Sequence, residues 1–173
     1  MKVWDLAVRL LHAGLGGSVV VAWVAGEASL QVHQWAGYGA VVIVLARCGW
    51  GVMGSRYARF DQFFRSPATV WRYAMAVARH QDARHLGHNP LGGWMVCALL
   101  ACTVSVGLTG WLYTLDRFWG MAWLEWLHHA LAWTLLGLIG LHLIGVAFTS
   151  WRHQENLVAA MLHGHKAAAP SED

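Results

Sequence analysis

Residues 127–142 read Leu-His-His-Ala-Leu-Ala-Trp-Thr-Leu-Leu-Gly-Leu-Ile-Gly-Leu-His, and this stretch decides the fold. It belongs to an apolar run of membrane-crossing length, with histidine near both ends and no charge between them. Because an α-helix turns by about 100° per residue, His128 and His142 project from one face, about 21 Å apart along the axis. His129 points to nearly the opposite side of the same helix.

The composition is that of an integral membrane protein, with membrane lipid as its surroundings. Of the 173 residues, 57% are hydrophobic and only 12% are charged, and the mean hydropathy is +0.42. Most of the tryptophans lie near the ends of apolar runs, where indole rings favour the membrane–water interface. The net charge of +3 comes from loops, so a nucleic-acid partner is not expected.

Four apolar runs are long enough to cross a hydrocarbon core, which takes about twenty helical residues. We therefore expect an all-α integral membrane protein, built as a four-helix transmembrane bundle over residues 1–153. Residues 154–173 are expected to form a cytoplasmic tail. The four predicted spans cover residues 7–26, 34–53, 91–113 and 124–148.

The loops predict the orientation of the bundle. The long loop over residues 54–90 carries six arginines, whereas the loops on the other side carry only Arg117. The positive-inside rule then places both termini and the long loop in the cytoplasm. Within this loop, Ser66-Pro67 predicts a helix start, and residues 67–79 are expected to form an interfacial helix. A solvated connector is the alternative.

Four of the eleven histidines lie in the spans or at their mouths, and they pair by depth. His12 pairs with His142 near the cytoplasm, and His33 pairs with His128 near the outside. An unpartnered polar ring in hydrocarbon costs several kcal/mol, so each histidine needs a partner.

The four histidines suit two haem irons, which take imidazole nitrogens as axial ligands. No predicted span carries Asp or Glu in its middle, and neutral imidazoles without carboxylates suit iron in a porphyrin better than a bare divalent cation. The sequence therefore favours two haems in the bundle core. Structural histidines and a histidine-based metal or proton transporter without haem are the alternatives.

Small and charged residues near these histidines fit the same hypothesis. Gly16 shares the helix face of His12, and Gly37 shares that of His33, which leaves room for a flat macrocycle or for helix packing. Arg47 lies on the His33 face but about 21 Å inward, where it would pair with haem propionates or snorkel to the interface. His88 is a candidate for contact with a propionate or a quinone head group, with an ordinary loop histidine as the alternative.

Several motifs carry a resemblance to a known family over nearly the whole chain. The chain resembles the bacterial cytochrome b561 family, which groups with the b-type cytochrome subunits of nickel-iron hydrogenases. The motifs are Val3-Trp4-Asp5, Arg9-Leu-Leu-His12, His33-x-x-x-Gly37-Tyr38, Arg47, Gly54-Ser-Arg-Tyr-Ala-Arg59-Phe60, Gly87-His-Asn-Pro-Leu-Gly-Gly93, Thr109-Gly110, His128 with His142, and Glu155-Asn156-Leu157.

The resemblance implies that His12, His33, His128 and His142 ligate two haems b. It also implies electron transfer between the membrane quinone pool and a periplasmic partner, a c-type cytochrome or a hydrogenase-like protein. The family often has an acidic residue after the outer ligand of the fourth helix, where this chain has His129, and the helix-face argument favours His128.

The sequence leaves the exact function and the oligomeric state open. A haem-bearing membrane anchor or assembly subunit of a larger redox complex is the alternative function. The chain is therefore either an electron-transfer protein or a subunit of a quinone-linked oxidoreductase, and it is compatible with a homodimer.

Overall fold

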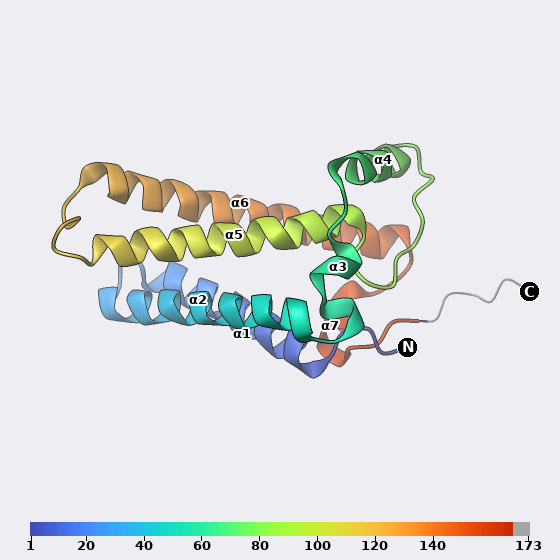
Figure 1. The fold of residues 1–173 in the computed structure, drawn as a ribbon, viewed down its shortest axis with the longest axis horizontal. Helices are drawn as coiled ribbons and strands as arrows, with labels where there is room; N and C mark the ends of the chain where they lie inside the picture. Colours follow the sequence, from blue (N-terminus) through green and yellow to red (C-terminus); the bar gives the residue numbers. More distant parts are fainter. Residues whose placement is uncertain (168–173) are drawn as a thin grey trace, which may run out of the picture.

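The computed structural model describes residues 1–167, and residues 168–173 of the predicted tail lie outside the described part. Within residues 1–167, four helices are long and apolar enough to cross a membrane. They run side by side as a bundle (Figure 1). The expectation of an all-α chain with four candidate membrane spans is confirmed. The spans are α1 (Leu6–Ala25), α2 (Leu30–Met53), α5 (Pro90–Tyr113) and α6 (Ala122–Arg152).

Side-chain caps set where these helices begin. The Asp5 carboxylate accepts from the Val8 N–H at 2.8 Å, and the Asn89 side chain accepts from the Gly92 N–H at 2.7 Å. Ser29 caps α2, which therefore begins at Leu30, four residues before the predicted residue 34. Helix α6 continues to Arg152, past the predicted residue 148. Its backbone hydrogen bonds extend into the polar residues that follow the apolar stretch.

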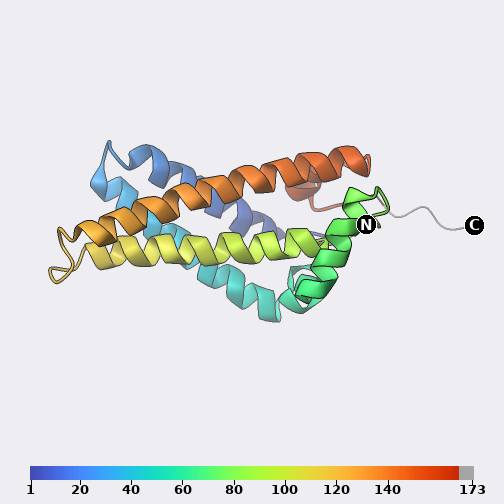
Figure 2. The ribbon, with the colours of Figure 1, turned by 90° about the horizontal axis from the view of Figure 1, so that it is seen from above.

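The bundle consists of two helix pairs. Helix α1 packs on α2, α5 packs on α6, and α2 joins the pairs by packing on α5 (Figures 1 and 2). A Cβ atom at Gly107 would collide with Cγ2 of Val41, so glycine permits the close α2–α5 approach seen here. Helix α6 packs far less closely on α1 and α2, although its two predicted ligands face those helices.

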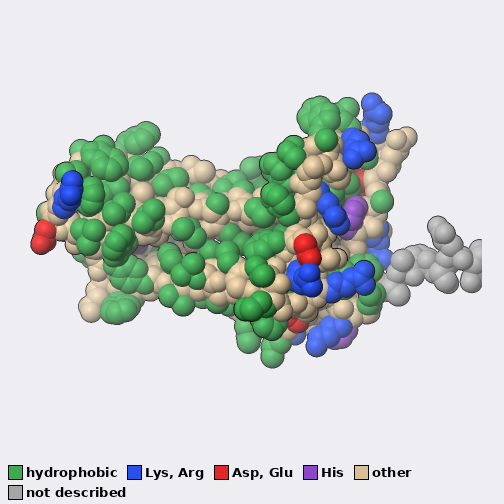
Figure 3. All heavy atoms as spheres, in the orientation of Figure 1, with side chains coloured by type: hydrophobic (Ala, Val, Ile, Leu, Met, Phe, Trp, Pro, Cys, Tyr) green, Lys and Arg blue, Asp and Glu red, His purple; other side chains and the backbone are tan. Residues whose placement is uncertain are grey.

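The outer surface suits a membrane. Hydrophobic side chains cover the visible length of the bundle, and lysine and arginine gather at the end that carries α3, α4 and α7 (Figure 3). Exposed apolar area on this scale marks contact with lipid in a bundle of spanning helices.

The N-terminus and α7, the last described helix, lie at the charged end (Figure 1). This end carries the 3-10 helix η1 (Arg56–Ala58), α3 (Phe60–Phe63), α4 (Pro67–Ala78) and α7 (Leu157–His163). The sequence predicts the range of α4 to within one residue, but its interfacial position remains a prediction.

The segment after residue 153, predicted only as a tail, folds back on the N-terminus. The amino group of Met1 donates to the Lys166 carbonyl at 2.8 Å, and Val3 N–H donates to the Gly164 carbonyl at 2.8 Å. Gly164 ends α7 with φ of +84°, and a Cβ there would lie 2.5 Å from the Trp4 carbonyl oxygen. The predicted division into a bundle of residues 1–153 and a tail of residues 154–173 remains a prediction.

Candidate cofactor-binding site

The four histidines predicted as ligands come together in the two predicted pairs. His12 of α1 faces His142 of α6, with ring centroids 6.4 Å apart. His33 of α2 faces His128 of α6, with ring centroids 6.0 Å apart. Helix α6 therefore contributes one imidazole to each pair, and their role as ligands remains a prediction.

The spacing within each pair fits a haem iron. A metal–imidazole bond is about 2 Å long, and a ring centre lies about 1 Å from its nitrogen. Two rings on opposite sides of one metal therefore have centroids roughly 6 Å apart. Within residues 1–167, no three His, Cys, Asp or Glu side chains gather as a metal site. Each pair offers two nitrogens, and a porphyrin supplies four more, so the residues present fit haem.

Hydrogen bonds fix the two rings of the outer pair. The Nδ1 atom of His33 lies 2.8 Å from the Ala22 carbonyl oxygen, to which it donates. The Nδ1 atom of His128 lies 3.1 Å from Oγ1 of Thr109, which itself donates to backbone carbonyls of α5. Both bonds leave Nε2 free, the arrangement that metal-ligating histidines generally have. Thr109 belongs to a family motif, but sequence reasoning assigned it no role.

His129 does not take part in the outer pair. It is exposed, and the ring that meets His33 belongs to His128. A Cβ atom at Gly110 would lie 3.1 Å from Cε1 of His128, so α5 approaches this ring closely. The structure therefore places His128, and not His129, opposite His33, and the role of His128 as a ligand stays a prediction.

Gly16 and Gly37 border open space. A Cβ atom at either position would meet nothing within 4 Å, so neither glycine sits in a close helix contact. Of the two explanations that the sequence leaves for these glycines, room beside a histidine fits the structure better than helix packing.

Arg47 is buried inside the protein, which excludes the snorkelling alternative. The residue is only 7% exposed, and its Nη2 atom donates to the Ala58 carbonyl at 3.0 Å. The guanidinium lies over the Phe60 ring, 5.3 Å from the centroid. A Cβ at Gly51 would collide with the Phe60 ring, so the absence of a side chain at this glycine makes room for that ring. Nη1 is buried and has no partner within the described residues.

His88 is partly buried, with its Nδ1 atom out of contact with solvent, and is not a solvated loop histidine. Its ring lies between those of Trp4 and Phe63, with a centroid distance of 4.8 Å to each. Burial, together with the positive charge of Arg47, lowers the pKa of His88 to about 3, so the ring is neutral. Its Nδ1 is the other buried side-chain atom without a partner in residues 1–167. Sequence reasoning missed Trp4 and Phe63 as the residues that hold it.

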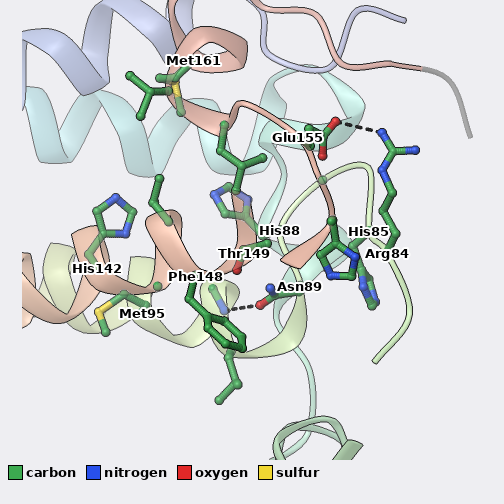
Figure 4. Close-up of a pocket in the computed structure, with 18 of the residues that line it drawn as sticks. Arg84, His85, His88, Asn89, Met95, His142, Phe148, Thr149, Glu155 and Met161 are labelled. Carbon is green, nitrogen blue, oxygen red and sulfur yellow. Dashed lines mark hydrogen bonds and ion pairs between the residues drawn. The ribbon is translucent and has the colours of Figure 1, made fainter. Parts of the chain in front are cut away.

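A cavity of about 590 Å³ connects the inner histidine pair to the charged end of the bundle. His12, His142 and His88 line it, and most of its remaining wall is apolar. Figure 4 shows His142 and Met95 on one side of the cavity, and Arg84, His85 and Glu155 on the other. Further lining residues include Tyr73 and Val77 of α4, Leu91 of α5, Phe148 of α6 and Met161 of α7.

Ion pairs hold the mouth of this cavity in shape. Glu155 pairs with Arg84 at 2.8 Å and with Lys166 at 3.3 Å. Although burial opposes ionisation, hydrogen bonds from Arg84 and the charge of Lys166 lower the pKa of Glu155 below its ordinary value. Asp82 similarly pairs with His153 at 3.0 Å and with Arg152 at 3.3 Å. Neither cluster was part of the predicted site.

Comparison with known proteins gives one match. The sequence model of the family described as prokaryotic cytochrome b561 matches residues 3–164. That range includes both histidine pairs, Arg47 and His88. Neither the curated proteins nor the solved structures that were searched contain a match.

Proposed function

Because the chain belongs to the prokaryotic cytochrome b561 family, we propose that its two histidine pairs bind two haems b and that it carries electrons across the membrane. Membership of this family implies a membrane b-type cytochrome that transfers electrons. The observation that carries the proposal of two haem sites is the spacing within the histidine pairs. Their ring centroids lie 6.4 Å and 6.0 Å apart, and α6 contributes one ring to each pair.

Each pair has a defined role in this proposal. His12 and His142 would hold the haem nearer the charged end, and His33 and His128 would hold the haem nearer the other end. When bound, each haem supplies a one-electron carrier whose potential the protein tunes. The bonds from His33 to Ala22 and from His128 to Thr109 orient the rings and increase the donor strength of the ligating nitrogens. Gly16 and Gly37 leave space for the macrocycle.

Two unpaired polar atoms support a propionate site at the inner pair. A buried guanidinium N–H without an acceptor is costly, and a carboxylate is its strongest partner. We therefore assign Arg47 Nη1 to a propionate of the inner haem. His88 Nδ1 would then hydrogen-bond to the same carboxylate or to the head group of a quinone in the adjoining cavity.

The cavity supports a quinone reaction at the charged end. Its apolar wall from α4, α5 and α6 suits a quinone ring and tail, and His142 in its lining gives contact with the inner pair. The arginine-rich loop supports a cytoplasmic location for this end, with both termini on that side of a bacterial inner membrane. Electrons would then pass between quinone at this end and a periplasmic c-type cytochrome or hydrogenase-like protein at the other.

Anaerobic reduction by a quinol tests this function. We expect the purified protein to show a reduced b-type absorption spectrum on mixing with quinol. The double variant His12→Ala/His142→Ala should keep about one haem, which dithionite reduces but quinol reduces much more slowly. The matched variant His33→Ala/His128→Ala should keep fast reduction of its remaining haem.

Two results would overturn the proposal. Absence of any b-type spectrum would favour a haem-free transporter or anchor. Equal quinol rates in the two double variants would remove the quinone site from the inner pair while leaving the haem assignment intact.

A further inference from the structure

Helix α4 and the residues beside it carry a basic and aromatic surface that the proposed electron transfer does not use. Arg72 lies within α4 (Pro67–Ala78), Arg65 directly precedes the N-cap residue Ser66, and Arg79 is the C-cap residue. All three are exposed. Within residues 1–167, none of them pairs with a carboxylate. Their positive charge is therefore not neutralised by the part of the chain that the structure describes.

Exposed aromatic side chains accompany these arginines. Trp71 is 68% exposed, Phe64 is 56% exposed and Trp94 is 40% exposed. The Phe64 and Trp94 rings stack with centroids 6.0 Å apart, and Nε1 of Trp94 donates to the Arg65 carbonyl at 2.9 Å. Trp94 belongs to the second turn of α5, so these contacts fix the surface at the depth where a membrane span begins.

The position of α4 matches the plane of a membrane surface. The helix lies across the end of the bundle, transverse to the long helices (Figures 1 and 2). Tyr73 and Val77 on its inner side line the cavity, so its other side is the one turned away from the bundle. The three arginines and three aromatic residues together form what we call the α4 face: Phe64, Arg65, Trp71, Arg72, Arg79 and Trp94.

We propose that the α4 face binds the head groups of anionic phospholipids in the adjacent leaflet. Guanidinium groups pair with phosphate through two parallel hydrogen bonds, and indole rings favour the head-group level. The surface is continuous with the apolar outer wall of α5, which fits lipid as the occupant. Each arginine near an anionic surface strengthens binding about fivefold, so three of them give a preference of tenfold or more over zwitterionic lipid. The proposal does not depend on haem or quinone.

Lipid binding to the purified full-length protein in detergent tests the proposal. Phosphatidylglycerol and phosphatidylcholine are titrated separately, and bound lipid is counted by native mass spectrometry. The test variant is Arg65→Gln/Arg72→Gln/Arg79→Gln. The control variant is Arg56→Gln/Arg59→Gln/Arg117→Gln, which removes the same charge from exposed arginines outside the α4 face. Soluble glycerol phosphate is added as a competitor.

We expect the protein and the control variant to prefer phosphatidylglycerol by tenfold or more, and the test variant to lose that preference. Higher ionic strength should weaken the preference in the unaltered protein, a readout that needs no variant. Equal binding of both lipids, or equal loss in the test and control variants, would overturn the proposal. Full displacement by glycerol phosphate would identify a site for free phosphate instead, and self-association through this face without lipid preference would identify a second copy of the chain as the occupant.

Discussion

The ring centroid of His128 lies 6.0 Å from that of His33, across the gap between α6 and α2, whereas the neighbouring His129 is exposed. The two adjacent histidines of α6 therefore have different surroundings. The ring of His128 faces His33 on one side, and its Nδ1 atom is hydrogen-bonded to Thr109 of α5.

We expect His128→Ala to lose about one haem per chain and His129→Ala to keep both. The substitution at residue 128 removes an axial ligand, whereas that at residue 129 removes a ring outside the pair. The ratio of haem to protein in the two purified variants measures the difference. Loss of haem from His129→Ala alone would show that the wrong histidine has been assigned.

Gly37→Leu should empty the outer site without disturbing the fold. A side chain at this position meets no protein atom within 4 Å at its Cβ, but it would enter the space beside His33. Gly49→Leu is the matched control, because Gly49 also has open space at its Cβ and points about 160° away from His33 around α2. Haem content and circular dichroism distinguish the two variants. Equal haem content in both would contradict a cofactor beside Gly37.

Arg47→Gln should lower the reduction potential of one haem by an amount on the order of tens of mV. Loss of a buried positive charge favours the ferric state, which carries one more positive charge than the ferrous state. A redox titration followed by absorption measures both potentials, with exposed Arg59→Gln as the control. Unchanged potentials in Arg47→Gln would remove this arginine from the propionate site.

Asp82→Asn should reduce thermal stability at neutral pH but not in acid. Burial raises the pKa of Asp82, yet hydrogen bonds and the charges of Arg152 and His153 together hold it below its ordinary value. A lowered native pKa stabilises the fold above the unfolded value of about 3.9 and ceases to do so as the pH falls through the native value.

The unfolding midpoint of Asp82→Asn at pH 7 should therefore lie below that of the unaltered protein, by about 2–4 °C for each kcal/mol lost. At a pH below the native pKa of Asp82, the two midpoints should converge. A constant difference at both pH values would show that the effect comes from packing and not from the charge of the carboxylate.

The spans and the histidine pairs were predictable because both depend on local features of the sequence. Apolar length identifies α1, α2, α5 and α6, and spacing along a helix identifies the shared face of His128 and His142. The helix bounds were less predictable. Ser29 begins α2 before the apolar run, and α6 extends to Arg152 beyond it, because backbone hydrogen bonding continues in water.

The surroundings of Arg47 and His88 were not predictable from the sequence. His88 is held by Trp4 and Phe63, and Arg47 by Ala58 and Phe60, from segments that only tertiary folding brings together. Helix α7 was missed because its seven residues are too short for a periodic pattern, and its place depends on pairing with the N-terminus. The Asp82 and Glu155 ion pairs depend on the same long-range contacts.

The ratio of haem b to polypeptide in the purified, unaltered protein tests the central claim most directly. If His12 with His142 and His33 with His128 each ligate one iron, the reduced-minus-oxidised spectrum is of the b type and the ratio is two. A ratio of one would leave one pair without its assigned role, and a ratio of zero would contradict the account as a whole.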